Sequence, residues 1–320
     1  MSRPEPQNLP ESLQRLLEQA RDLAALQRAQ GLEYTPIGMR ESLELMTRRY
    51  VTQAPELPWT RDTLVRISDD SAYPVPIRIY HPNPLQAIPV LVFAHGGGHM
   101  AGSVVVYDSI ARKLAVASQR VLVSVDYRLS PECPYPSGLL DLKNVIRQVF
   151  PTLERLGVAH LPQLAVAGDS GGGAIAASAV HQLADEHHIE IDRQVLIYPS
   201  LDYTMSTPSM SSRGEGYLLE RQRIAWLFDQ YFQHGEDRRR ASPLFMALPE
   251  RYPKTLIVTA EYCPLRDEGF AYEERLAAAG FEVENLHFPN MIHAFLNLED
   301  RAGDECGEFY RAFGKFLLDA

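Results

Sequence analysis

The sequence is poor in cysteine and in basic charge. Its 320 residues include three cysteines, and none of them are paired at Cys-x-x-Cys spacing, which argues against a disulfide scaffold and against a structural zinc site. Basic residues number 31 and acidic residues 41, so the formal net charge is −10. This balance argues against nucleic-acid binding, which needs a basic face, and suits a protein that acts on neutral substrates.

Long apolar runs are also missing. No run approaches the roughly 20 residues that a membrane-spanning helix needs. The N-terminal stretch has no apolar segment behind Arg3, so it does not resemble a secretory signal. We therefore expect a cytoplasmic protein that does not contact a membrane.

The chain divides into a helical preamble and a region where strands and helices alternate. Residues 1–54 contain two amphipathic helical patterns, which we interpret as an N-terminal helical cap. Residues 55–320 alternate between strand and helix patterns, which predicts an α/β core with a mostly parallel sheet. This alternation fails at about residues 201–225, where we expect an excursion that covers the carboxyl edge of the sheet. The expected strands are 63–68, 77–80, 89–94, 121–126, 164–167, 194–198, 255–259 and 283–287.

The strongest local signal is the string GDSGG at residues 168–172, directly after an expected strand and before an Ala-rich helix. A serine on such a tight turn adopts a strained backbone, and the flanking glycines leave room for the turn. The helix N-terminus also places free N–H groups beside the hydroxyl. Ser170 is therefore the candidate nucleophile.

Two further segments can complete the site. His95-Gly96-Gly97-Gly98 follows the strand at 89–94, and consecutive glycines expose backbone N–H groups that can bind an oxyanion together with the N–H of Gly171. His293 lies in a loop after the last expected strand and downstream of Ser170, which makes it the candidate base.

With these motifs in view, the sequence resembles the bacterial hormone-sensitive-lipase-type (family IV) carboxylesterases of the α/β-hydrolase superfamily, and most closely the acetyl-esterase-like enzymes. The resemblance covers nearly everything from about residue 61 onward. The motifs that carry it are HGGG at 95–98, DYRLSPE at 126–132, GDSGG at 168–172, YPSLD at 198–202, PLRDEG at 264–269 and HAF at 293–295.

This resemblance implies a fold, an activity and a set of site residues. The fold is an eight-stranded, mostly parallel sheet flanked by helices, with a helical cap. The activity is hydrolysis of short-chain acyl esters through a serine acyl-enzyme, with no metal and no organic cofactor, on a small-molecule ester substrate. A homodimer through a sheet edge fits the family. The implied site comprises the nucleophile Ser170, the base His293, the oxyanion donors Gly97, Gly98 and Gly171, and the pocket residues His95, His99, Tyr127 and Tyr198.

The sequence departs from the family at the triad acid. The family has Asp directly before Pro-Leu, and this chain has Cys263 there. A neutral thiol cannot hold the imidazole tautomer or offset its positive charge as a carboxylate does.

Three explanations of Cys263 stay open at this stage. Another carboxylate can substitute, and Glu261, Asp267 and Asp202 are the candidates. Alternatively, the site works slowly as a Ser–His dyad, aided by Cys263 as a thiolate. In the third, Cys263 was introduced and the natural chain has Asp. The alternative function is a catalytically weak or inactive member of the fold that binds a small molecule.

Overall fold

Eight strands form one sheet at the centre of the computed structural model, which describes residues 4–66 and 73–319. Their order is β1-β2-β4-β3-β5-β6-β7-β8. The strand β2 pairs antiparallel with both β1 and β4, and all other neighbours are parallel. The strands are β1 Trp59–Val65, β2 Val75–His81, β3 Ile88–Ala94, β4 Val121–Val125, β5 His160–Asp169, β6 Arg193–Ile197, β7 Lys254–Tyr262 and β8 Val283–Ile292.

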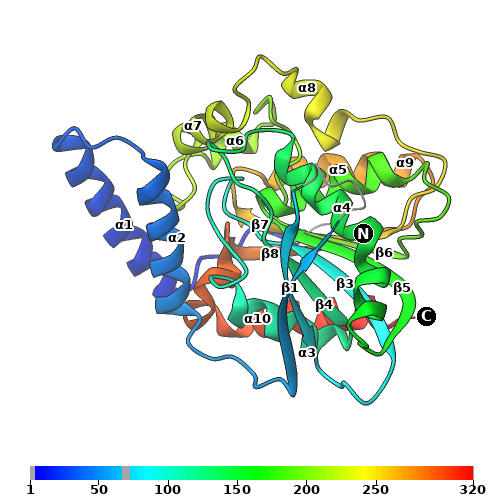
Figure 1. The fold of residues 1–320 in the computed structure, drawn as a ribbon. Helices are drawn as coiled ribbons and strands as arrows, with labels where there is room; N and C mark the ends of the chain where they lie inside the picture. Colours follow the sequence, from blue (N-terminus) through cyan, green and yellow to red (C-terminus); the bar gives the residue numbers. More distant parts are fainter. Residues whose placement is uncertain (1–3, 67–72, 320) are drawn as a thin grey trace.

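Helices cover both faces of this sheet (Figure 1). The helices α3 and α10 pack together on one face, and α4, α5 and α9 lie on the other. The α-helices are α1 Glu11–Ala29, α2 Pro36–Tyr50, α3 Asp108–Ser118, α4 Ser137–Arg155, α5 Gly171–Leu183, α6 Ser209–Ser212, α7 Arg221–Tyr231, α8 Arg238–Ala241, α9 Arg266–Ala278 and α10 Gly303–Leu318, with short 3₁₀ helices at Pro243–Phe245 and Phe295–Arg301. The expected α/β-hydrolase architecture with an eight-stranded, mostly parallel sheet is confirmed.

Burial explains why the central segments read as continuous apolar runs. Every residue of β4 is buried, because helices cover that strand on both faces. Along α5 even the first eleven residues, from Gly171 to His181, are buried. Small side chains let this helix approach the sheet closely, and a Cβ atom at Gly172 would collide with the carbonyl oxygen of Ala94.

The first strand differs from the sequence prediction. We expected it at 63–68, whereas β1 is Trp59–Val65. The cause is antiparallel pairing with β2, where Trp59 lies opposite His81 and Val65 opposite Val75. Backbone pairing recruits the polar residues 60–62, which the apolar pattern alone does not mark as a strand. Positions 67 and 68 of the expected strand lie outside the described residues.

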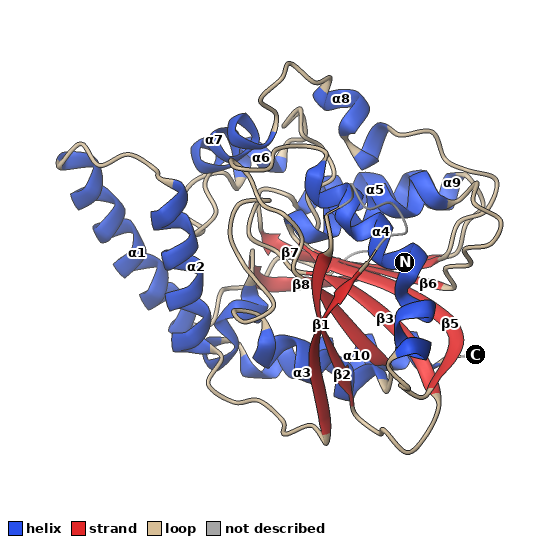
Figure 2. Cartoon of the chain, viewed as in Figure 1, coloured by secondary structure: helices blue, strands red, loops and turns tan. Residues whose placement is uncertain are grey.

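The segments outside the core gather at one end of the sheet. The helices α1 and α2 stand side by side at its flank, and the connection from β6 to β7 carries α6, α7 and α8 over the top of the view (Figure 2). Within the described residues, no helix combines the length and the apolar character that crossing a membrane requires.

Strand register brings the important loops to this end. Ala94 of β3 pairs with Gly168 of β5, so the loop that starts at His95 lies beside the turn that holds Ser170. Tyr262 of β7 pairs with Ile292 of β8, so the residues that follow these two positions are also neighbours. The carboxyl ends of parallel strands thus place four distant segments at one edge.

Candidate active site

Ser170 sits on a strained turn between β5 and α5. Its φ of 53° and ψ of −120° are unusual for a residue with a side chain. A Cβ atom at Gly168 would collide with the backbone of Gly172, and one at Gly172 with the carbonyl oxygen of Ala94, so the turn needs glycine at both positions. This local geometry holds the hydroxyl at the carboxyl edge of the sheet, at the N-terminus of α5.

The structure brings Ser170 and His293 together. The Oγ atom of Ser170 lies 2.9 Å from Nε2 of His293, across 123 positions of sequence. The imidazole is held edge-on against the ring of Tyr198, with the two ring centroids 4.9 Å apart. This distance allows direct proton transfer from the hydroxyl to the ring.

Cys263 occupies the far side of the imidazole. Its Sγ atom lies 3.2 Å from Nδ1 of His293, and the backbone N–H of Leu265 donates to the same sulfur at 3.3 Å. Burial raises the pKa of the Cys263 thiol far above its usual value, so the sulfur is a neutral thiol. The hypothesis that Cys263 assists as a thiolate is therefore disfavoured.

Glu261 is held by cations rather than by the imidazole. Its Oε1 atom accepts hydrogen bonds from Arg213 at 2.8 Å and from Arg266 at 2.6 Å. Its side chain is 5% exposed, so these ion pairs are largely shielded from water. Its Oε2 atom lies 3.4 Å from Nε2 of His287, and among the described residues no contact links Glu261 to His293.

Asp267 and Asp202 are likewise engaged elsewhere. Asp267 accepts from the backbone N–H of Ser209 at 2.9 Å, and Asp202 accepts from the backbone N–H groups of Thr204 and Ser206. The expectation that one of three nearby carboxylates replaces the missing acid is thus not supported by the contacts. Each of these side chains fixes a local loop instead.

Burial also changes the base itself. His293 is 5% exposed, and desolvation lowers the pKa of its imidazole to about 3. Among the described residues, no carboxylate contacts this ring to oppose the effect. The ring is therefore neutral over the physiological pH range, which leaves Nε2 able to accept a proton.

The glycines expected to bind an oxyanion line the same space as Ser170. Gly97 and Gly98 have φ of 124° and 63°, and a Cβ atom at Gly171 would lie only 3.1 Å from the backbone nitrogen of His99. The two loops therefore touch. Within the part of the chain that the structure describes, the N–H groups of Gly97, Gly98 and Gly171 have no protein acceptor.

Asp169 supports this arrangement, although sequence reasoning passed over it. Its carboxyl group accepts from the backbone N–H of Gly96 at 2.6 Å and from the hydroxyl of Tyr107 at 3.1 Å. Burial raises the pKa of Asp169 to about 7. The residue beside the nucleophile thus ties the elbow to the glycine loop, and its place in GDSGG was the available signal.

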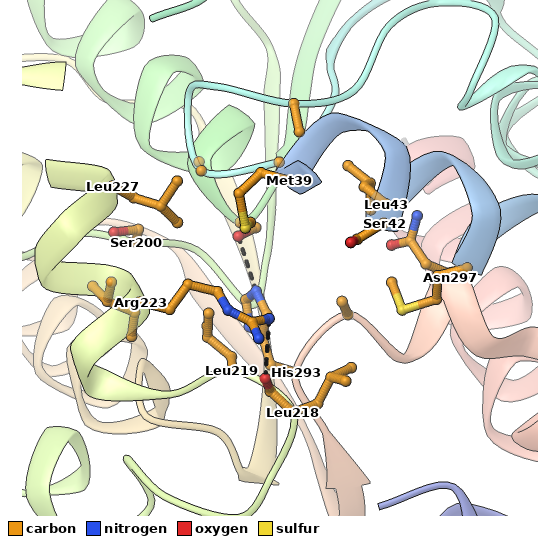
Figure 3. A pocket seen from close by; sticks show the side chains of 18 of the residues that line it. Met39, Ser42, Leu43, Ser200, Leu218, Leu219, Arg223, Leu227, His293 and Asn297 are labelled. Carbon is orange, nitrogen blue, oxygen red and sulfur yellow. Dashed lines mark hydrogen bonds between the residues drawn. The ribbon is translucent and has the colours of Figure 1, made fainter. Parts of the chain in front are cut away.

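A cavity of about 320 Å³ opens beside Ser170 and His293, and Figure 3 shows the side chains around it. The helices α1, α2 and α7 form much of its wall. Their lining residues are mostly apolar: Ala20, Leu23, Ala24, Gln27, Met39, Ser42, Leu43, Met46, Arg223, Ile224, Leu227 and Phe228. The segments outside the core therefore shape the space in front of Ser170.

Three of the four residues expected in the pocket do not line it. His99 does, but His95, Tyr127 and Tyr198 lie behind the wall, which corrects that expectation. The ring of His95 stacks on Tyr127 with centroids 4.5 Å apart, and the Tyr127 hydroxyl donates to the His95 carbonyl oxygen. The rings of His95 and Tyr127 therefore stabilise the glycine loop by packing against each other and do not face the cavity.

His99 is a neutral member of the wall. Its ring stacks on Tyr231 with centroids 3.9 Å apart, and its Nε2 atom lies 3.2 Å from the hydroxyl of Tyr203. Burial lowers the pKa of His99 to about 3. Among the described residues, no group of three or more His, Cys, Asp or Glu side chains is placed to hold a metal ion.

Comparison with known proteins identifies the family. A family model of the alpha/beta hydrolase fold matches residues 91–297. An ethyl acetate hydrolase of Pseudomonas putida is 35% identical over 230 residues, which are 70% of this chain and 72% of the relative. A carboxylesterase of Mycobacterium tuberculosis is 35% identical over 257 residues, 78% of this chain and 80% of the relative.

A solved structure extends the match to nearly the whole chain. A hyperthermophilic esterase from the archaeon Pyrobaculum calidifontis superposes with a TM-score of 0.85 at 31% identity, covering 98% of this chain and 100% of that one. The motifs, the sheet order and these relatives agree. The chain belongs to the α/β-hydrolase family, in its hormone-sensitive-lipase-type branch of carboxylesterases.

Proposed function

We propose that this protein hydrolyses carboxylic esters through an acyl-enzyme formed on Ser170. The observation that carries the proposal is the 2.9 Å approach of Ser170 Oγ to His293 Nε2 beside backbone N–H groups that have no protein acceptor in the described residues. A nucleophile, a base and oxyanion donors at one carbonyl are what acyl transfer requires. The relatives named above, an ethyl acetate hydrolase and a carboxylesterase, support the same reaction.

The reaction follows from the geometry. Ser170 Oγ attacks the ester carbonyl carbon while its proton passes to Nε2 of His293. The N–H groups of Gly97, Gly98 and Gly171 stabilise the oxyanion of the tetrahedral intermediate. The imidazolium then gives its proton to the departing alcohol, which leaves the acyl group on Ser170. Water, deprotonated by His293, repeats the attack and releases the carboxylic acid.

Cys263 makes this reaction slow. To accept at Nε2, His293 must carry its other proton on Nδ1, and the neighbour there is the neutral sulfur 3.2 Å away. A thiol is a weak acceptor and does not stabilise the imidazolium that forms. We therefore infer a Ser–His dyad with low turnover.

The cavity supports small substrates. Its volume of about 320 Å³ lies at the lower end of the range for small-molecule sites. Apolar side chains from α1, α2 and α7 surround it. We propose short acyl chains as the preferred substrates.

Hydrolysis of short and long nitrophenyl esters by the wild type and by Ser170→Ala tests the enzyme proposal. We expect faster hydrolysis of short esters by the wild type and only background rates with Ser170→Ala. Equal background rates in both proteins would refute it.

The second candidate function is binding of a small molecule without turnover, and the absence of a carboxylate at Nδ1 favours it. A serine-directed phosphonate separates the two, because it labels an activated Ser170 and leaves an inactive site unmodified. The homodimer and the cytoplasmic location stay predictions; analytical ultracentrifugation and cell fractionation test them.

A further inference from the structure

Arg223 stands out among the side chains that line the cavity. It lies on α7, it is half-buried, and its guanidinium points into the space in front of the nucleophile (Figure 3). Asp169 also lines the cavity, but its carboxyl group already accepts hydrogen bonds from Gly96 and Tyr107. The lining imidazoles of His99 and His293 are neutral, so Arg223 is the cation among the described side chains of this wall.

The guanidinium has few partners. Its Nη1 atom donates to the carbonyl oxygen of Leu218 at 3.4 Å, and its Cζ atom lies 5.6 Å from the ring centroid of Tyr34. Its Nε atom is buried without a hydrogen-bond partner. Across residues 4–66 and 73–319, no carboxylate pairs with Arg223, whereas Arg213 and Arg266 both pair with Glu261.

Other polar atoms in the same wall are also unpaired. His99 Nδ1, Ser200 Oγ and Asn297 Oδ1 belong to residues that line the cavity, and each atom is buried with no hydrogen-bond partner in the described structure. The protein covers these three atoms almost completely, so a ligand in the cavity does not reach them, and Arg223 remains the charged group that such a ligand can contact.

We propose that the natural ester carries a carboxylate, which Arg223 binds inside the cavity. This inference rests on the proposed hydrolysis and names its substrate class: an ester with a second, ionised carboxyl group on its acyl or its alcohol half. A planar guanidinium binds a carboxylate with two parallel hydrogen bonds, which fixes orientation as well as charge. The ring of Tyr34 also contacts the guanidinium through a cation–π interaction.

The net charge of −10 does not oppose this proposal at close range. At long range the molecule acts as a single negative charge, which favours neutral substrates over anionic ones. Screening in salt reduces that repulsion beyond about 8 Å, whereas a contact inside a desolvated cavity is screened much less. The local cation therefore decides which ester is bound.

Matched esters test the proposal. The substrate pair 4-nitrophenyl hydrogen glutarate and 4-nitrophenyl pentanoate differs by a carboxylate on the acyl half, and 4-acetoxybenzoate with 4-acetoxybenzamide differs by one on the alcohol half. For each ester, kcat/KM of the wild type is divided by that of Arg223→Met, so that intrinsic reactivity cancels. We expect this ratio to be about 10 to 100 for one of the two anionic esters and within about threefold of unity for the neutral esters.

Two further variants serve as controls. Arg223→Lys keeps the positive charge and should restore part of the preference. Arg221 is an exposed cation on the same helix, and it does not line this cavity. Arg221→Met should therefore leave kcat/KM for all four esters unchanged. Ratios near unity for both anionic esters overturn the proposal, as does an equal effect of Arg221→Met.

A binding measurement separates this proposal from the proposed hydrolysis. Calorimetry with Ser170→Ala measures the affinity for the probes monomethyl glutarate and 4-acetoxybenzoate with and without Arg223→Met. Weakening of either probe by about tenfold supports the anion site even if no ester is turned over. Equal affinities in the two proteins contradict it, even if neutral esters are hydrolysed normally.

Discussion

Cys263 Sγ lies 3.2 Å from His293 Nδ1, in the position from which a carboxylate orients the base in related esterases. The backbone N–H of Leu265 donates to this sulfur, so the loop presents a donor that suits a negatively charged acceptor. The machinery around the imidazole is otherwise complete. We therefore expect the identity of this one side chain to limit the rate of hydrolysis.

Replacing Cys263 by Asp should increase turnover. A carboxylate at this position holds the Nδ1–H tautomer and stabilises the imidazolium, and we expect kcat to rise by about a hundredfold or more. Steady-state hydrolysis of a short nitrophenyl ester measures the change. Cys263→Ser is the matched neutral control and should stay near the wild-type rate, while Ser170→Ala added to Cys263→Asp should abolish the gain. No gain from Cys263→Asp would mean that the missing acid does not limit this chain.

Removing the other carboxylates should affect folding rather than catalysis. Glu261→Gln breaks the largely buried pairs with Arg213 and Arg266, and we expect it to lower the free energy of unfolding by about 1–3 kcal/mol. Asp267→Asn should leave kcat within about threefold of the wild type, since its carboxylate does not contact His293. Thermal denaturation and rates per titrated active site separate the two effects. A near-complete loss of turnover in folded Glu261→Gln or Asp267→Asn would identify a substitute acid that we have not recognised.

As the pH falls through neutrality, kcat/KM should not decrease, because His293 stays unprotonated. His293 acts as a base only when it is neutral, and burial lowers its pKa from the ordinary 6.5 to about 3. The neutral form is therefore kept as pH falls, and kcat/KM should change by less than about twofold between pH 7.5 and 5.5. In Cys263→Asp the new negative charge raises the pKa of His293, so the acid limb should move upward toward pH 6. A wild-type limb near pH 6.5 would contradict this account.

Two glycines of the elbow should respond differently to alanine. A Cβ atom at Gly172 would collide with the Ala94 carbonyl oxygen, so Gly172→Ala should cost about 3 kcal/mol of stability and most of the activity. At Gly171 the nearest atom, the His99 nitrogen, lies 3.1 Å away, so Gly171→Ala needs only a small adjustment and places a better helix former at the start of α5. Chemical denaturation compares the two variants. Equal loss of stability in both would show that the loops cannot adjust at position 171.

The sequence predicted the fold and the meeting of Ser170 with His293 because their signals are local. GDSGG between an apolar strand and an Ala-rich helix marks Ser170, and the alternation of strands and helices predicts the sheet. His293 follows from its place after the last strand. The start of β1 was missed, since pairing with β2 rather than apolar pattern defines it. The pocket positions of His95, Tyr127 and Tyr198 were also wrong, because a motif does not say which side of a loop a ring packs on.

By itself, the amino-acid sequence determined the order of strands and helices, the turn at Ser170 and the absence of a carboxylate at position 263. Tertiary structure alone decided that the sulfur of Cys263 meets His293, that Glu261 is bound by arginines, and that Arg223 faces the cavity without a carboxylate partner in the described chain. The physical reason is the distance along the chain over which each feature is decided. Turns and periodicity depend on neighbours a few residues apart, whereas contacts between side chains depend on how strands pair and helices pack across the whole fold.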